Sequence, residues 1–353
     1  MSIFFTTFSK IFGFLTALSI FFILVILIIN FLDLSNDKDN FQYLDGNKKS
    51  LNKIALIHLN GPIITEPSNF INFGLLGQLD VIYPSLVKKY LNELSNEQIV
   101  GLIFTINSPG GSVSASEQIY RMINDFKIKN NLKIYFHSSE MLASGGYWVA
   151  LSGDKIFSSY GSLIGSIGVK GPDWLYYNNP NSLSSGFLGT SVESENGIQM
   201  FSNTAGKSKD ILNPFRTPSL KEKKQLQKMV NNIYEDFVNL VSKNRKIEKK
   251  IIINEIGAMI YDSKEAKKNY LINNINNLDE VLQNMINDLF LEDYQVIKKN
   301  TKNVFSVKNI GFYNIVNNKD SFKKSIDYIN NKICYNSKHE LSSIIYNSYK
   351  FDC

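Results

Sequence analysis

Strand-like and helical stretches alternate through the first half of the chain. Residues 99–106 form an apolar run rich in β-branched side chains, which is typical of a central strand in a parallel sheet. Similar strand-like stretches occupy residues 53–59, 132–136 and 155–158, and helical spacing of apolar residues occupies 84–94 and about 114–126. Because strands separated by helices of this length form βαβ units, the sequence predicts an α/β fold with a mainly parallel sheet.

An uncharged apolar segment precedes this alternation. Residues 11–32 are long enough to cross a hydrocarbon layer of about 30 Å, which takes about 20 apolar residues. The apolar region of a cleaved signal peptide is only about 7–15 residues long, so we expect an uncleaved membrane anchor. Lys10 precedes the segment, whereas Asp33, Asp37 and Asp39 follow it. This distribution favours a cytoplasmic amino terminus, with the rest of the chain on the outer face of the membrane.

The remaining segments suggest a simple domain organisation. We expect residues 1–34 to form the anchor, 35–52 a polar linker, 53–290 the main domain and 291–353 a C-terminal extension. Within the main domain, apolar residues recur on one face of residues 221–242, which predicts a long amphipathic helix.

Composition excludes several classes of function. The net charge is +6, but the lysines are scattered and form no basic patch with aromatic residues, so we expect no nucleic-acid partner. The histidines (His58, His137 and His339) share no metal-ligand spacing with one another or with Cys334 and Cys353, so we expect no metal site and no cofactor. The two cysteines are compatible with a disulfide or with two free thiols.

One hydroxyl lies beside two glycines soon after a predicted strand. Ser144 is followed directly by Gly145 and Gly146. A serine at a sharp strand-to-helix bend can present its hydroxyl to a cleft while the neighbouring amides bind a developing oxyanion. Upstream, Gly110 and Gly111 end the central strand and allow the backbone to approach a ligand closely. Each motif taken alone is also compatible with a structural turn.

A nucleophilic serine needs a base. His137 lies at the end of the strand that leads to the bend and His58 lies in the first strand, so we expect both to be structural. A lysine can replace histidine where burial lowers its pKa from about 10.4 toward neutrality. Because the chain has 38 basic residues, local chemistry leaves this lysine unassigned.

Three sequence blocks together resemble a known family. Residues 106–113 (INSPGGSV), 143–148 (ASGGYW) and 165–169 (GSIGV) are similar, in order and spacing, to the signature blocks of bacterial signal peptide peptidase A. The similarity runs from about residue 53 to residue 244. It implies a membrane-anchored serine peptidase with the crotonase/Clp-protease type of fold, a superhelix of repeated ββα units.

The resemblance also implies the roles of individual residues. Ser144 matches the family's nucleophile, and Ser166 matches the serine that hydrogen-bonds the base. Residues 206–215 (GKSKDILNPF) resemble the segment that carries the general-base lysine. Its spacing to the Pro-Phe pair selects Lys209, with Lys207 as the alternative.

The oxyanion would be bound by backbone amides. The resemblance and the glycine loops together point to Gly110 or Gly111 and to Gly145. Two later segments, 257–262 and 270–273, depart from the Gly-Arg and Gly-Leu-Val-Asp elements that the family carries after the long helix.

The resemblance implies that the protein degrades cleaved signal peptides and other short hydrophobic peptides at the bacterial inner membrane. Its members form ring-shaped homo-oligomers, octamers or tetramers, in which serine and lysine come from neighbouring subunits. The alternatives are a related membrane quality-control protease that clears misfolded proteins and a catalytically inactive scaffold of the crotonase fold. Acyl-CoA-binding crotonases share the fold, but the Ser144–Lys209 pair and the anchor argue against that activity.

Overall fold

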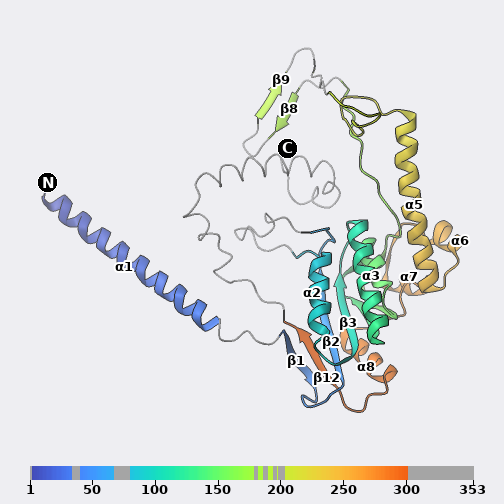
Figure 1. Ribbon diagram of the computed structural model, residues 1–353, viewed down its shortest axis with the longest axis horizontal. Helices are drawn as coiled ribbons and strands as arrows, with labels where there is room; N and C mark the ends of the chain where they lie inside the picture. The colour runs from blue at the N-terminus through green and yellow to red at the C-terminus, as the bar shows by residue number, and fades with distance from the viewer. Residues whose placement is uncertain are drawn as a thin grey trace. The chain divides into compact units, whose positions relative to one another are not determined.

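The chain folds as two units, shown as a computed structural model in Figure 1. One unit comprises Met1–Ser166 and Ala258–Tyr313, and the other comprises Ile167–Gly257 and Asn314–Cys353. The structure describes residues 2–33, 40–66, 80–178, 182–185, 190–193, 197 and 203–300. His339, Cys334 and Cys353 therefore lie outside the described residues.

A seven-stranded sheet forms the centre of the first unit. Its strand order is β1-β12-β2-β3-β4-β6-β11. All neighbours pair in parallel except β1 and β12, which are antiparallel. The strands are β1 (Phe41–Gly46), β2 (Lys53–Asn60), β3 (Ile99–Asn107), β4 (Lys133–Ser138), β6 (Lys155–Ser158), β11 (Asn274–Ile275) and β12 (Gln295–Lys299). The prediction of an α/β fold with a mainly parallel sheet is confirmed.

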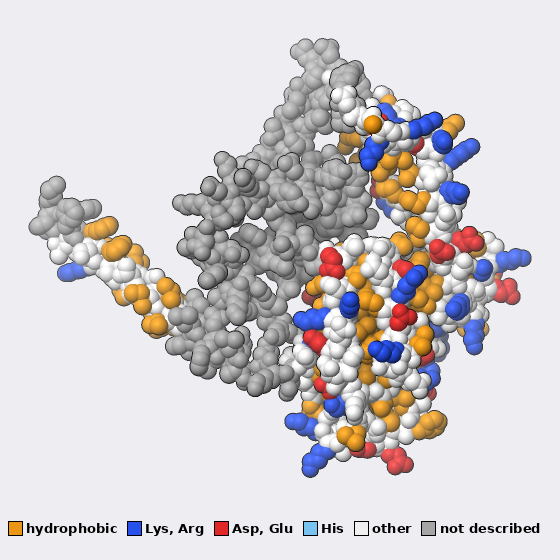
Figure 2. All heavy atoms as spheres, in the orientation of Figure 1, with side chains coloured by type: hydrophobic (Ala, Val, Ile, Leu, Met, Phe, Trp, Pro, Cys, Tyr) orange, Lys and Arg blue, Asp and Glu red, His pale blue; other side chains and the backbone are white. Residues whose placement is uncertain are grey.

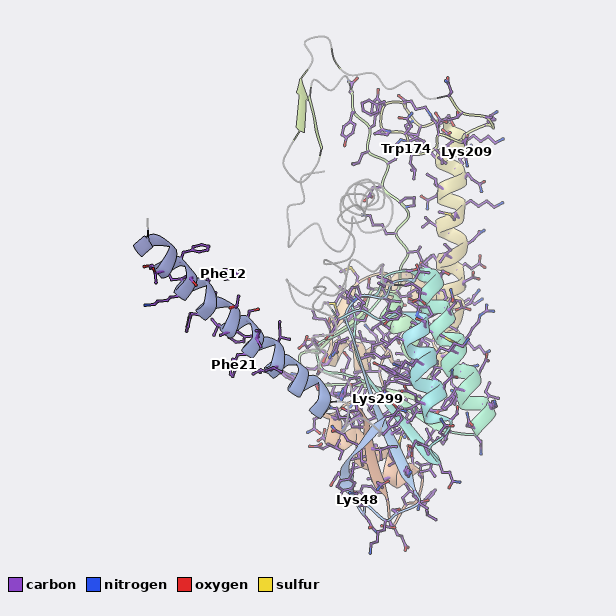
Figure 3. The ribbon with its side chains drawn as sticks, turned by 60° about the vertical axis from the view of Figure 1, so that its left-hand side comes forward. Phe12, Phe21, Lys48, Trp174, Lys209 and Lys299 are labelled. Atoms are coloured by element: carbon purple, nitrogen blue, oxygen red, sulfur yellow. The ribbon has the colours of Figure 1, made fainter. Side chains whose placement is uncertain are left out.

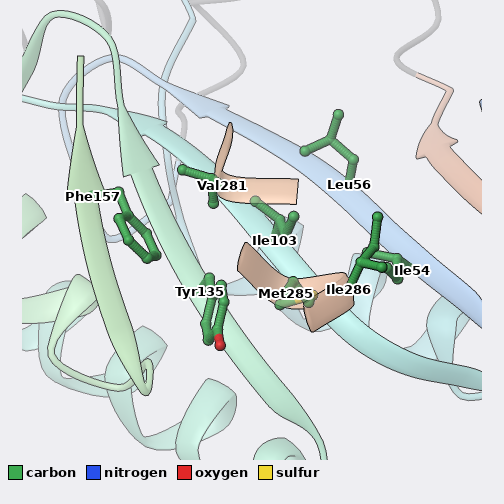
Figure 4. Close-up of a cluster of buried hydrophobic side chains, with 8 residues drawn as sticks. All are labelled: Ile54, Leu56, Ile103, Tyr135, Phe157, Val281, Met285 and Ile286. Carbon is green, nitrogen blue, oxygen red and sulfur yellow. The ribbon is translucent and has the colours of Figure 1, made fainter. Parts of the chain in front are cut away.

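One face of this sheet packs against α8 (Leu278–Asp288). Figure 4 shows the resulting hydrophobic cluster, to which both the strands of the sheet and α8 contribute side chains. It consists of Ile54, Leu56, Ile103, Tyr135, Phe157, Val281, Met285 and Ile286. A Cβ atom on Gly101 of β3 would lie 2.5 Å from the sulfur of Met285, so the glycine lets α8 approach the sheet closely.

The other face is covered by α2 (Pro84–Leu94) and α3 (Val113–Asn130), which lie side by side in Figure 1. Side chains alternate between the two faces of a strand, so β3 contributes Leu102, Phe104 and Ile106 to this side, and all three are fully buried. The rings of Phe104 and Phe136 stack with their centroids 5.1 Å apart. The sheet is therefore buried on both faces, which explains the continuous apolar run of its central strand.

A second sheet, of three strands, leads into the Ser144 motif. Its order is β10-β7-β5, with β5 (Met141–Ala143) parallel to β7 (Leu163–Gly165) and β10 (Ile260–Asp262) antiparallel to β7. Short helices α4 (Gly145–Ala150) and α7 (Ser263–Lys268) follow β5 and β10. These strands were not expected from the sequence, because each is only three residues long.

A buried lysine ties the edge of the main sheet to α2. Lys299 of β12 is 6% exposed, and its Nζ lies 2.8 Å from a carboxylate oxygen of Glu93 and 3.1 Å from the carbonyl oxygen of Asn40. The ammonium also lies over the rings of Phe41 and Tyr90. Strands β1 and β12 thus belong to the folded unit, although the sequence analysis assigned residues 41–46 to a linker and 295–299 to a C-terminal extension.

The second unit is built around one long helix. Helix α5 (Leu220–Arg245) matches the predicted amphipathic helix at 221–242, and α6 (Lys249–Ile251) and the π-helix η1 (Ile252–Ile256) follow it. A two-stranded antiparallel pair, β8 (Ser182–Ser185) and β9 (Thr190–Glu193), precedes it in the chain. A capping box between Ser219 and Glu222 fixes the start of α5.

Helix α1 (Ser2–Asp33) carries the apolar segment predicted as an anchor. Residues Thr6–Val25 have a mean hydropathy of 2.1, and none of this stretch is buried in the protein. Its hydrophobic side chains are exposed along the helix, as Figures 2 and 3 show, with Phe12 and Phe21 labelled in Figure 3. By length and composition, α1 is able to span a bilayer.

Truncating the core beneath α8 should destabilise the first unit. Met285 is fully buried, so Met285→Ala removes packed atoms and leaves a cavity, with an expected loss of about 2–5 kcal/mol in the free energy of unfolding. Urea unfolding of the detergent-solubilised chain measures this loss. Phe290→Ala is the control, because Phe290 is 91% exposed and its truncation should cost less than about 0.5 kcal/mol. Equal effects of the two substitutions would contradict the packing described for α8.

Candidate active site

Ser144 occupies the sharp bend between β5 and α4. Its φ is +52° and its ψ is −122°, a backbone conformation that non-glycine residues rarely adopt. The bend is held by two backbone hydrogen bonds: the Ser144 amide donates to Gly165 O (2.9 Å), and the Trp148 amide donates to Ser144 O (2.9 Å). The sequence prediction of a strand-to-helix bend at Ser144 is confirmed. Backbone strain of this kind concentrates at functional sites, which makes Ser144 a candidate for chemistry.

The glycine loop after β3 lies directly against this bend. Gly110 has a φ of +99°, and a Cβ atom added to it would lie 2.7 Å from both Ser144 Cβ and the Gly145 nitrogen. Any residue larger than glycine at position 110 would therefore clash with the Ser144 bend. The two glycine motifs, more than thirty positions apart in the printed sequence, therefore form one site.

Two backbone amides at this junction are available for a ligand. The Gly110 amide donates to the hydroxyl of Ser108 at 3.1 Å. The amides of Gly111 and Gly145 have no hydrogen-bond partner among the described residues, and a Cβ atom on Gly145 would lie 3.3 Å from the Gly111 nitrogen. Of the two alternatives that the sequence left open, this geometry favours Gly111 over Gly110 as the partner of Gly145.

Ser166 directly follows β7, just as Ser144 directly follows β5. Ala143 and Gly165 are the last paired residues of the two parallel strands, and each is followed by a serine with a φ of +52°. The Ser166 amide donates to Met259 O at 2.7 Å. The segment 257–262, which departs from the family pattern, thus supplies β10 and holds Ser166 in place.

Asn107 fixes the turn that leads into β5, a role that the sequence analysis missed. Its Oδ1 accepts hydrogen bonds from the amides of Ser139 and Glu140, both at 3.0 Å, and from the hydroxyl of Ser138 at 3.1 Å. An asparagine directly before a Ser-Pro-Gly-Gly turn was the available signal, because its side chain can bond backbone groups nearby. The carboxyl end of β3 thereby positions both the glycine loop and β5.

The described histidines have partners other than Ser144. His137 is 4% exposed, and its Nε2 lies 3.1 Å from both Ser159 Oγ and Asn276 O. His58 Nδ1 pairs with the hydroxyl of Thr105 on the neighbouring strand. Burial lowers the pKa of both imidazoles, with a nearby Lys298 adding to the effect at His58. Both histidines are structural, as the sequence predicted.

The two candidate lysines belong to the second unit. Lys207 and Lys209 are exposed, and the Lys209 amide donates to Gly206 O at 3.2 Å within a series of turns. The first unit thus brings together Ser144, Gly110, Gly111, Gly145 and Ser166, whereas the pairing of Ser144 with a lysine stays a prediction. The described residues contain no group of three or more histidine, cysteine or acidic side chains that could hold a metal ion.

Comparison with known proteins finds one matching family model and several similar proteases. Residues 127–291 match the family described as Peptidase family S49. Two relatives are the "Putative protease MJ0651" of Methanocaldococcus jannaschii, 32% identical over 215 residues (59% of this chain, 64% of the relative), and the "Putative signal peptide peptidase SppA" of Enterococcus faecium, 28% identical over 247 residues (70% and 66%). The chain thus aligns with slightly less than two thirds of each relative's length.

A solved structure that matches part of the chain is a mutant of ClpP1 from Listeria monocytogenes. It is 18% identical, and the alignment covers 64% of this chain and 92% of that chain with a TM-score of 0.38. The family model that matches residues 127–291 spans Ser144 and Ser166, and it describes serine peptidases of the kind that the three sequence blocks resemble.

The buried histidines predict how stability depends on pH. The pKa of His137 is lowered by burial, so the folded state favours the neutral ring, whereas the unfolded chain takes up a proton as the pH falls below about 6.5. The free energy of unfolding should therefore fall as the pH drops from neutral to mildly acidic. Urea unfolding across this interval measures the slope. His137→Gln should reduce the slope, with His58 accounting for the remainder, and an unchanged slope would contradict this assignment.

Proposed function

We propose that this protein is a serine peptidase of family S49 that uses Ser144 as its nucleophile and Lys209 as its general base. The observation that carries the proposal is the strained Ser144 bend, with the Gly111 and Gly145 amides unpaired beside it in the described structure. The sequence around Lys209 supports the choice of base, because its spacing to Pro214 and Phe215 matches the family pattern.

In this mechanism the neutral amine of Lys209 takes the proton from Ser144 Oγ as the oxygen attacks the scissile carbonyl carbon. The Gly111 and Gly145 amides bind the oxyanion that forms, each worth about 2.7–4 kcal/mol by comparison with known oxyanion donors. Collapse of the tetrahedral intermediate breaks the C–N bond, and the lysine ammonium gives its proton to the leaving amine. A water molecule, deprotonated by the same lysine, then hydrolyses the acyl-serine ester.

Ser166 would orient the base. Its register position beside Ser144 allows its hydroxyl to accept a hydrogen bond from the lysine ammonium or donate to the neutral amine. This role would hold the amine toward Ser144.

The substrates are proposed to be cleaved signal peptides and other short hydrophobic peptides at the membrane. Helix α1 supports this proposal, because a tethered site meets peptides in the same bilayer at a high effective concentration. In the proposed topology the amino terminus is cytoplasmic and the catalytic part lies on the outer side of the bacterial inner membrane. The proposed anchor is residues 1–34.

The protein is further proposed to act as a ring-shaped homo-oligomer, a tetramer or octamer with sites shared between subunits. Exposed apolar side chains on α5 support an interface in the second unit: Leu220 is 77% exposed and Met229 is 41% exposed. A groove of about 740 Å³ between residues 169–176 and the start of α5 offers a surface for a second copy.

Active-site labelling tests the catalytic assignment. A fluorophosphonate probe should label the full-length protein and Lys207→Ala, but not Ser144→Ala, because only Ser144 is the proposed nucleophile. Lys209→Ala should be labelled about 100- to 10,000-fold more slowly, the usual contribution of a general base. Labelling is followed by gel fluorescence and the site by peptide mass spectrometry. Labelling of Ser144→Ala would refute the nucleophile, and loss in Lys207→Ala alone would move the base to Lys207.

Substrate preference is tested in proteoliposomes. A hydrophobic signal-like peptide inserted in the bilayer should be cleaved with a kcat/KM at least about tenfold above that of a polar peptide of equal length, because both enzyme and substrate are confined to the membrane. Mass spectrometry of the products gives both rates, and Ser144→Ala is the blank. A preference for the polar peptide, or for unfolded full-length membrane proteins, would favour the quality-control alternative.

A further inference from the structure

The turns that carry Lys209 have little regular structure of their own. Backbone hydrogen bonds link Lys209 to Gly206 (3.2 Å), Ile211 to Ser208 (3.1 Å) and Asn213 to Asp210 (3.0 Å). Ser208 and Leu212 both have positive φ, at +62° and +69°. A leucine in this conformation is strained, and such strain persists only where the surrounding structure enforces it.

Arg216 holds this strained turn through hydrogen bonds to two carboxylates. Its Nε and Nη2 atoms donate to the two carboxylate oxygens of Asp210 at 2.6 and 2.9 Å. Its Nη1 and Nη2 atoms donate to the two carboxylate oxygens of Glu222 at 2.9 and 2.6 Å. One guanidinium thus makes two bidentate pairs, a geometry that lysine cannot reproduce.

This network holds the residues on both sides of Lys209. Asp210, directly after it, is bound by Arg216, and Ser208, directly before it, hydrogen-bonds to Glu222. The Lys209 side chain itself is exposed and lies outside the network. The backbone of Lys209 is therefore fixed at both ends while its amine stays available. Of the two residues beside Lys207, only Ser208 belongs to this network.

The network is anchored to more rigid parts of the second unit. Glu222 is 5% exposed and belongs to the capping box at the start of α5. The Arg216 guanidinium lies 5.3 Å from the centre of the Trp174 ring, and the Trp174 indole donates to Asn213 O at 3.0 Å. Figure 3 shows Trp174 and Lys209 together near the amino-terminal end of α5.

The charges of this network persist over a wide pH range. Hydrogen bonds from Arg216 lower the pKa of Glu222 and of Asp210, and the two carboxylates raise the pKa of Arg216. The pairs stay ionised at the pH values where a lysine base would titrate.

We propose that Arg216 is a positioning residue for the general base, holding the turn around Lys209 through Asp210 and Glu222. This inference rests on the proposed function, since it assumes that Lys209 acts as the base. Loss of the two bidentate pairs would release the turn and let the amine move away from the serine hydroxyl.

The test measures the rate of fluorophosphonate labelling of Ser144 across neutral to alkaline pH in full-length Arg216→Lys and Arg216→Ala. Both should be labelled about 10- to 100-fold more slowly, because small displacements of a catalytic group have costs of this size. The pH of half-maximal labelling should rise, since a lysine free in solvent has a pKa of about 10.4. Added guanidinium ion should restore labelling of Arg216→Ala in part, by occupying the vacated site.

The controls separate this inference from the proposed function and from loss of folding. Arg121→Ala removes an arginine that pairs with Glu117 on the surface of α3, and should be labelled at the wild-type rate. Wild-type rate and pH profile in Arg216→Lys, with Lys209→Ala labelled about 100- to 10,000-fold more slowly, would overturn the positioning role and leave the proposed base intact. Normal labelling of Lys209→Ala would overturn the base itself. A uniform fall at every pH without recovery in guanidinium would also reject the positioning role, because loss of folded protein alone produces it.

Discussion

The close approach of two backbone segments at Ser144 is the constraint on which the site depends. A Cβ atom at position 110 would lie 2.7 Å from both Ser144 Cβ and the Gly145 nitrogen, so this junction exists only with glycine on the loop. A Cβ atom on Gly145 would lie 3.3 Å from the Gly111 nitrogen, so the two amides that we propose as oxyanion donors belong to this junction. Oxyanion binding of this kind uses groups that are fixed before the reaction, so no reorganisation is required when charge develops.

The sheets hold this junction in register. Strand β3 ends at Asn107, whose side chain binds the turn into β5, and β5 pairs with β7 so that Ser144 and Ser166 follow the same register pair. The carboxyl ends of parallel strands are the usual location of active sites in α/β proteins, because loops from several strands converge there. A shift of β5 by one residue would turn Ser144 to the other face, so pairing register and serine position are coupled.

Sequence patterns predicted the helices and strands that carry a regular pattern of buried apolar residues. They missed the short strands that are defined only by their hydrogen bonds to neighbouring strands. The helix at 84–94 and the strand at 155–158 agree with α2 and β6, because apolar periodicity determines both. Strands β5, β7 and β10 have three residues each, too few for a periodic signal, yet they position both serines. Lys299 lies in the segment that the sequence analysis assigned to a C-terminal extension, and the aromatic rings and Glu93 around it explain its burial. The motifs alone pointed to Ser144, to Gly145 and to the Gly110–Gly111 pair, whereas the preference for Gly111 over Gly110 required the hydrogen bond from the Gly110 amide to Ser108.

The proposed lysine base would impose one further requirement, which a histidine base does not have. Lysine accepts a proton only when neutral, and burial is the main means by which a protein favours the neutral amine at ordinary pH. The Arg216 network fixes the backbone around Lys209 but leaves its side chain exposed. Holding the turn and desolvating the amine are therefore separate tasks. In the proposed mechanism, the surface that desolvates the amine would come from a second copy of the chain or from the bound peptide. In the last case the base would become effective only when substrate occupies the site, so an apolar peptide would promote its own cleavage while water-exposed polar peptides would not.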